Sequence, residues 1–264
     1  MTGLHVPLRM IDTHQHLWML SERRYDWIQP EHGVLHADFG PGAVAADIVA
    51  AGITGTLLVQ AADTYEDTFY MLSIASCVPG IDGVVGWVPL DRPDEARAAL
   101  ELYSTTPIIR GVRALTHTYD DPEWILRADV TTSLDLVSAH GYTLDYVSVL
   151  PEHLELLPEL AARHPSLTIV IDHLAGPDIA NGGWEPWASL IAGCAVRPNL
   201  FVKLSGLSTA PACGAHSARS PRTSHRSSRT TSSSRPRFAP MRFVTSTQDH
   251  LNSERRPPWI RHRR

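Results

Sequence analysis

The sequence predicts an α/β fold, a (β/α)8 TIM-type barrel with about seven recognisable strands and an incomplete last βα unit. Short apolar runs rich in Val, Ile and Leu alternate with stretches of helical spacing, and parallel strands need such crossover connections. An open doubly wound sheet satisfies the same alternation. However, no GxGxxG motif follows the first run, and polar residues stand where the runs end. Both features favour the barrel, whose active sites lie at the carboxyl ends of its strands.

The expected strands and helices follow one another along the first three quarters of the chain. The strands are expected at residues 9–13, 55–60, 83–88, 108–113, 142–146, 167–172 and 200–203. The helices are expected at residues 42–52, 65–77, 93–103, 129–141, 151–164 and 184–195. Several helices have Pro in the first turn and Gly after the last one, as is usual at helix ends. With 264 residues, 43% of them hydrophobic, the chain can bury a substantial core.

The charge pattern divides the chain after Gly206. Eleven basic and 26 acidic residues precede Leu207, whereas 12 arginines and only two acidic residues follow from there on. We therefore expect an incomplete barrel over residues 1–207 and a Ser/Arg/Pro-rich, disordered tail over residues 208–264, because this composition buries little apolar surface. Our hypothesis is that a reading-frame slip in a GC-rich gene produced this tail. The alternative is a genuine basic tail, but it lacks interleaved aromatic residues, so no nucleic-acid partner is expected.

Nothing in the sequence suggests export or a membrane partner. No segment approaches the roughly 18 apolar residues of a membrane-spanning helix, and the first residues contain no signal-peptide core. The cysteines Cys77, Cys194 and Cys213 are odd in number and form no CxxC pair, which favours reduced thiols over disulfides. We expect a soluble cytoplasmic protein, and no feature indicates an oligomeric state.

The segment "MIDTHQHLW" at residues 10–18 contains a His-x-His pair directly after a strand-like run. The period of two in an extended chain places His14 and His16 on the same side. Both imidazoles can then converge on one metal ion or one substrate group. A chain with 14 histidines also produces such a pair by chance, so the pair alone does not decide between the two interpretations.

The surrounding residues resemble one family. The run "MIDTHQHLWMLSERRYDWI" is similar to the start of amidohydrolase-like lactonases, the branch that contains L-fuconolactonase and L-rhamnono-lactonase. The resemblance continues in collinear order through "GVVGWVPLD", "RGVRALTHTYDDPEWILR", "IDHLAGPDIANGGWEPWASLIA" and "NLFVKLSGL". It covers nearly all of residues 10–207 and implies a metal-dependent hydrolase fold with a role in carbohydrate metabolism.

The resemblance gives further residues a role. It implies that His173 in "VIDHLAGP" joins His14 and His16 as a catalytic residue and as a third metal ligand. Arg113, Gln60, Trp87 and Lys203 stand at the ends of expected strands and are expected to bind substrate. Structural roles remain open for them: Trp87 can be a core aromatic residue, and Lys203 a buried counter-ion. Asp145 and Asp172 also stand at the ends of expected strands, where they can cap a loop or orient a histidine.

The implied reaction is hydrolysis of a sugar-acid lactone, a small-molecule substrate, by activated water. One zinc-like divalent ion or a metal-independent site is compatible with two histidines at this spacing. Family members end an eighth strand with a "GSDWP"-like motif whose aspartate is the expected base, and no such motif occurs here. Two alternatives therefore stay open. One is another hydrolase or a decarboxylase of the superfamily, and the other is an inactive, truncated product.

Overall fold

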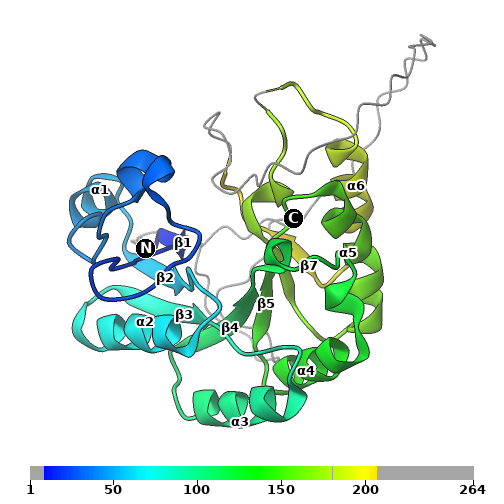
Figure 1. The fold of residues 1–264 in the computed structure, drawn as a ribbon, viewed down its shortest axis with the longest axis horizontal. Helices are drawn as coiled ribbons and strands as arrows, with labels where there is room; N and C mark the ends of the chain where they lie inside the picture. Colours follow the sequence, from blue (N-terminus) through cyan, green and yellow to red (C-terminus); the bar gives the residue numbers. More distant parts are fainter. Residues whose placement is uncertain (1–8, 180, 207–264) are drawn as a thin grey trace, which may run out of the picture.

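Seven parallel strands form one curled sheet in the computed structural model, which describes residues 9–179 and 181–206 (Figure 1). The strands pair in the order in which they occur in the chain, so each neighbour is reached by one crossover connection. They are β1 (Ile11–Gln15), β2 (Gly55–Val59), β3 (Ile81–Gly86), β4 (Ile109–Ala114), β5 (Thr143–Tyr146), β6 (Ile169–Ile171) and β7 (Leu200–Val202). The predicted incomplete (β/α)8 barrel is confirmed.

The helices lie on the outer side of the curled sheet, between successive strands (Figure 1). They are α1 (Ala45–Ala50), α2 (Tyr65–Cys77), α3 (Pro93–Ser104), α4 (Ala128–Ala139), α5 (Pro151–Arg163) and α6 (Trp187–Ala195). Short 3-10 turns η1 (Pro30–Leu35), η2 (Thr116–Thr118), η3 (Trp124–Leu126) and η4 (Asp172–Ala175) occupy loops. In the part of the chain that the structure describes, no helix is long and apolar enough to cross a membrane.

The predicted start of the first strand was wrong by two residues. The strand begins at Ile11, because Ile11 is opposite Gly55 and the pairing with β2 continues as far as Gln15. His14 therefore lies inside β1 rather than after it. The third strand also begins two residues earlier than expected, at Ile81, and the first helix is shorter than expected. These boundaries depend on strand pairing, which local hydrophobicity does not define.

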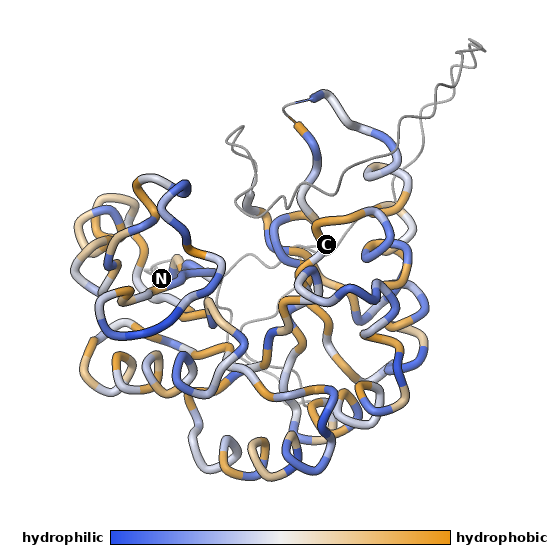
Figure 2. Tube along the Cα trace, in the orientation of Figure 1, coloured by the Kyte–Doolittle hydropathy of each residue, from blue (hydrophilic) through white to orange (hydrophobic). Residues whose placement is uncertain are grey.

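The core lies between the sheet and its helices. Hydrophobic colours dominate the strands, while the helices alternate between hydrophobic and hydrophilic positions (Figure 2). Val112 of β4, Leu144 of β5 and Ile169 of β6 are buried together with Leu134 of α4 and Leu157 of α5 in one continuous cluster. This cluster fixes the centre of the sheet and leaves the carboxyl ends of the strands for polar residues.

β1 and β7 are the two edges of the sheet within the described residues. A cavity of about 470 Å³ lies beside β1, and Asp12, His14 and Gln15 line it together with Ile48 of α1. α1 contains no buried residue, so this side of the fold is the least covered. The expected tail, residues 208–264, lies outside the described residues.

Burial in the central cluster should decide the stability of the chain. We expect Leu134→Ala in α4 to lower the free energy of unfolding by about 2–5 kcal/mol, because Leu134 is fully buried and its removal leaves a cavity. Leu102→Ala in α3 is the matched control, since this helical leucine is 56% exposed, and we expect a change within about 0.5 kcal/mol. Chemical denaturation of both variants provides the measurement. Equal losses would contradict this description of the core.

Candidate functional site

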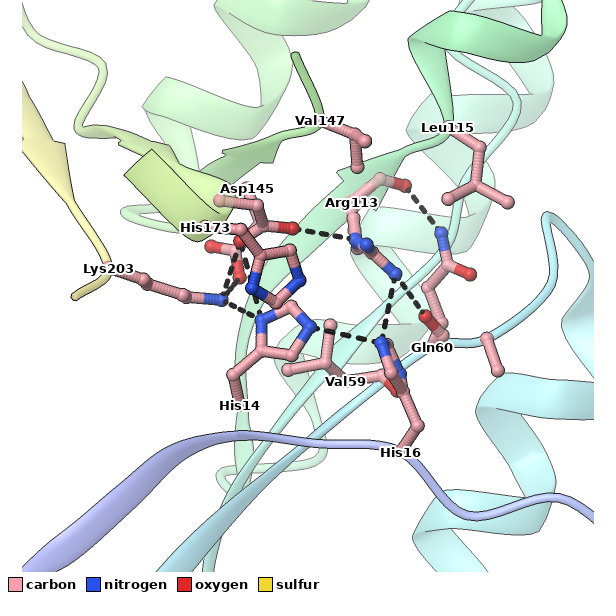
Figure 3. A network of polar contacts seen from close by, with 12 residues as sticks. His14, His16, Val59, Gln60, Arg113, Leu115, Asp145, Val147, His173 and Lys203 are labelled. Carbon is pink, nitrogen blue, oxygen red and sulfur yellow. Dashed lines mark hydrogen bonds and ion pairs between the residues drawn. The ribbon is translucent and has the colours of Figure 1, made fainter. Parts of the chain in front are cut away.

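Polar and charged side chains from six of the seven strands or the residues that follow them meet at the carboxyl ends of the sheet (Figure 3). Parallel strands bring all these ends to one side of the barrel, although the residues are far apart in the chain. The cluster consists of His14 of β1 and His16 directly after it, Gln60 after β2, Arg113 of β4, Asp145 of β5, Asp172 and His173 after β6, and Lys203 after β7.

The two histidines at the end of β1 contact one another directly. The Nε2 atoms of His14 and His16 are 3.0 Å apart, and His16 Nδ1 lies 2.8 Å from the carbonyl oxygen of Val59. Burial lowers the pKa of both rings, with a further contribution from Lys203 for His14 and from Arg113 for His16, whose pKa falls to about 3. Both rings are therefore neutral near pH 7.

Arg113 ties β4 to β6 and β2. Its Nε donates a hydrogen bond to Asp172 Oδ2 at 2.8 Å, and its Nη1 donates to the Gln60 carbonyl oxygen at 2.9 Å. The Gln60 side-chain amide in turn donates to the carbonyl oxygen of Arg113 at 3.2 Å. A guanidinium held at two of its nitrogens has a fixed orientation, so Arg113 presents its remaining N–H groups in a defined direction.

Lys203 lies in the interior between two carboxylates and a histidine. Its ammonium donates to Asp145 Oδ2, forms an ion pair with Asp172 Oδ1 at 3.0 Å and lies 2.9 Å from His14 Nδ1. Although burial favours the neutral amine, Asp145 and Asp172 raise the pKa of Lys203. Burial would likewise raise the pKa of Asp172, but Lys203, His14 and Arg113 hold it well below its ordinary value. The lysine and Asp172 are both charged.

His173 stands in an unusual turn. His173, Leu174 and Ala175 have φ angles of 51°, 54° and 59°, a left-handed conformation that costs energy for residues other than glycine. Ser205 Oγ lies 2.8 Å from His173 Nδ1, and the His173 ring centroid is 4.3 Å from that of His14. Burial lowers the pKa of His173, so the ring is neutral and its Nε2 remains for water or substrate.

The structure brings together all but one of the predicted site residues. His14, His16, His173, Arg113, Gln60 and Lys203 lie within one network of contacts. Trp87 does not join it: its ring meets Tyr65 at a centroid distance of 5.1 Å, and in the described residues no hydrogen bond or ring contact links it to the histidines.

The sequence left open whether Asp145 and Asp172 cap a loop or orient a histidine, and the structure places both carboxylates at the centre of the site. Their only sequence signal is their position at the ends of buried apolar runs. Such a position is equally common for residues that cap a loop, so the role becomes visible only when Lys203 and Arg113 are placed beside them.

Three side chains of the site carry atoms of the kind that bind a metal ion. Atoms of His14, Asp172 and His173 all lie within 4.8 Å of one another, and imidazole and carboxylate ligands are typical of zinc sites. However, the Lys203 ammonium contacts both His14 Nδ1 and Asp172 Oδ1, where an ion bound to these two atoms would lie. In this arrangement the residues do not fit a metal ion at that position.

Comparisons with known proteins agree with the fold. The family model described as amidohydrolase matches residues 11–243. A protein of Burkholderia ambifaria named L-fucono-1,5-lactonase is 37% identical over 199 residues, which cover 75% of this chain and 68% of that protein. A protein of the same name from Burkholderia multivorans is 30% identical over 205 residues, with the same coverage.

Solved structures lead to the same family. The crystal structure of an amidohydrolase from Burkholderia multivorans with bound zinc is similar, with a TM-score of 0.69 and 29% identity, covering 75% of this chain and 70% of that one. The chain belongs to the amidohydrolase family of hydrolases.

Asp63 beside the site should produce a measurable pH effect. Burial raises its pKa to about 6, against hydrogen bonds from Gln60 Nε2 at 2.8 Å and the Leu115 amide at 3.4 Å. The Asp63 carboxyl therefore binds a proton more tightly in the folded protein than in the unfolded chain. As the pH rises from about 4 to about 6, the carboxyl loses this proton and its contribution to the free energy of unfolding falls. In urea titrations at several pH values we expect Asp63→Asn to lack this fall. An unchanged pH dependence would contradict the assignment.

Gly206 should be required for the position of His173. A Cβ at Gly206 would lie 2.7 Å from the Cβ of His173. We therefore expect Gly206→Ala to displace the His173 ring and to lower the free energy of unfolding by about 1–3 kcal/mol more than its control does. Gly141→Ala is that control, because Gly141 has a similar φ of +74° against +70° and no atom within 4 Å of an added Cβ. Denaturation of the two variants measures the difference, and equal costs would show that the contact with His173 is not limiting.

Proposed function

We propose that the protein hydrolyses a small sugar-acid lactone. Two proteins named L-fucono-1,5-lactonase, 37% and 30% identical to this chain, support this reaction class. The single observation that carries the proposal is the convergence of three imidazoles and one guanidinium around buried carboxylates at the carboxyl ends of the strands. This arrangement combines donors for a carbonyl oxygen with a neutral base.

The carbonyl is polarised by Arg113. Arg113 Nε and Nη1 are occupied by Asp172 and Gln60, so Nη2 is directed to the substrate. As water attacks, negative charge develops on the carbonyl oxygen, and fixed N–H donors stabilise it more in the transition state than in the ground state. The burial of Arg113, which is 6% exposed, strengthens this effect because little water screens the charge.

The water proton goes to His173. Its Nδ1 faces Ser205 Oγ, which leaves Nε2 as the base, and its lowered pKa keeps this nitrogen unprotonated at neutral pH. The new bond joins the water oxygen to the carbonyl carbon, the ring C–O bond breaks, and the proton passes from His173 to the leaving oxygen. The product is an open-chain hydroxy acid.

The proposal gives supporting roles to His16, which was expected to be catalytic, and to Gln60, which was expected to bind substrate, and it keeps the role expected for Trp87. His16 supports His14, Gln60 orients Arg113, and Trp87 remains a proposed substrate contact at the mouth. The expected eighth-strand aspartate has no counterpart among the described residues, so His173 takes its role as base. Cys77 and Cys194 are free thiols, which supports a reducing compartment, the cytoplasm.

The proposal is tested with the full chain and a panel of aldonolactones that includes L-fucono-1,5-lactone. We expect turnover of at least one lactone, and we expect His173→Ala to lower kcat by about 10²–10⁴-fold, the usual contribution of a general base. His36→Ala is the matched control, because His36 is exposed; its rate should equal that of the unmodified chain. Release of acid, followed with a pH indicator, measures the rate.

Two results would overturn the proposal. The first is no turnover of any lactone above the buffer rate. The second is turnover that His14→Ala and His173→Ala leave unchanged, which would place the reaction elsewhere in the molecule.

A further inference from the structure

Lys203 is surrounded by acceptors on all sides. An ammonium has three N–H donors and no acceptor, and Lys203 Nζ has three neighbours: Asp145 Oδ2, Asp172 Oδ1 and His14 Nδ1. The side chain is 3% exposed. No N–H remains for a substrate, so these contacts describe a residue that acts through its neighbours.

The contacts define where each imidazole proton lies. His14 Nδ1 lies 2.9 Å from the Lys203 ammonium and 3.4 Å from Asp172 Oδ1. Because the ammonium is closer and has no lone pair, His14 Nδ1 accepts its hydrogen bond, and the neutral His14 ring carries its proton on Nε2. That N–H donates to His16 Nε2 at 3.0 Å. His16 therefore carries its proton on Nδ1, from which it donates to the Val59 carbonyl oxygen at 2.8 Å.

An independent contact supports the same assignment from the other end. The Val59 carbonyl oxygen only accepts, so His16 must have its proton on Nδ1 and a lone pair on Nε2. Arg113 Nη1, which only donates, also approaches this lone pair at 3.5 Å. The donors Lys203 and Arg113 and the acceptor Val59 thus demand the same pair of tautomers.

We propose that Lys203 is a positioning residue that keeps this site in a hydrogen-bonding state rather than a metal-binding one. Its ammonium takes the place of a cation between His14 Nδ1 and Asp172 Oδ1, and it fixes the proton of His14 on Nε2. A metal ion on Nε2 of both histidines would require that proton to move to Nδ1, where it would face the ammonium at 2.9 Å. Lys203 therefore opposes a metal ion between His14 Nδ1 and Asp172 Oδ1, and it also opposes a metal ion on the Nε2 atoms of the two histidines.

The consequence for catalysis rests on the proposed function: the Arg113 guanidinium polarises the lactone carbonyl in place of a metal ion. The proton positions and the zinc affinity are measured without any lactone. Absence of lactonase activity with the expected tautomers would refute only the proposed function, and activity with the opposite tautomers would refute only the role of Lys203.

The first test uses the unmodified full chain. Lys203 is the only lysine among the 264 residues, so ¹⁵N-lysine labelling gives a single side-chain signal in NMR spectra. We expect a slowly exchanging NH₃⁺ signal, as a buried ammonium requires. Long-range ¹H–¹⁵N spectra of the histidine rings, assigned with His14→Gln and His16→Gln, should give Nε2–H for His14 and Nδ1–H for His16. A fast-exchanging lysine signal, or Nδ1–H on His14, would overturn the proposal.

The second test measures zinc affinity by calorimetry with ZnCl₂. The double variant Lys203→Met/Asp145→Asn removes one positive and one negative charge together, and Asp145→Asn alone is its control. We expect the double variant to bind zinc at least about 10-fold more tightly than the control. This is the usual effect on metal affinity of residues that are hydrogen-bonded to a metal ligand. Lys203→Arg, which keeps the charge, should bind as weakly as the unmodified chain. Equal affinities in the double variant and the control would overturn the proposal, and if the double variant fails to fold, the tautomers of the unmodified chain decide.

Discussion

The ion cluster of Lys203, Arg113, Asp145 and Asp172 is the interaction on which the candidate site depends. Two cations and two carboxylates lie in the interior, where each charge alone would cost several kcal/mol. Each is stable there only because the others are present, and the remaining hydrogen bonds go to His14 and to the Gln60 carbonyl oxygen. A change in one member would therefore alter the charge and orientation of all its neighbours.

The same cluster joins parts of the sheet that are distant along the chain. Arg113 reaches Asp172 across 59 residues, and Lys203 reaches His14 across 189 residues. β1 and β7 share no backbone pairing within the described residues, so the contact between His14 and Lys203 is a side-chain link between the two edge strands. Fold and site thus support one another, because the curl of the sheet brings the charges together and the charges hold the curled edges.

The sequence was informative wherever the signal was local. α2 has the predicted bounds, and the neighbouring strands differ from the predicted ones by a few residues, because apolar runs and helix-end residues are local features. The His-x-His spacing correctly placed two imidazoles side by side. The start of β1 was missed, since its register depends on β2. The roles of Asp145 and Asp172 were left open, since their charged partners lie at least 31 residues away in the chain.

By itself, the sequence determined the order of strands and helices, the family, and the residue types available at the strand ends. The tertiary structure decided how these residues are used. Lys203, expected to bind substrate, is enclosed by two carboxylates and a histidine, and Trp87 packs against Tyr65 outside the cluster. The physical reason is that hydrophobic periodicity encodes which face of an element is buried, whereas the partner of a buried charge is set by the approach of other strands in three dimensions.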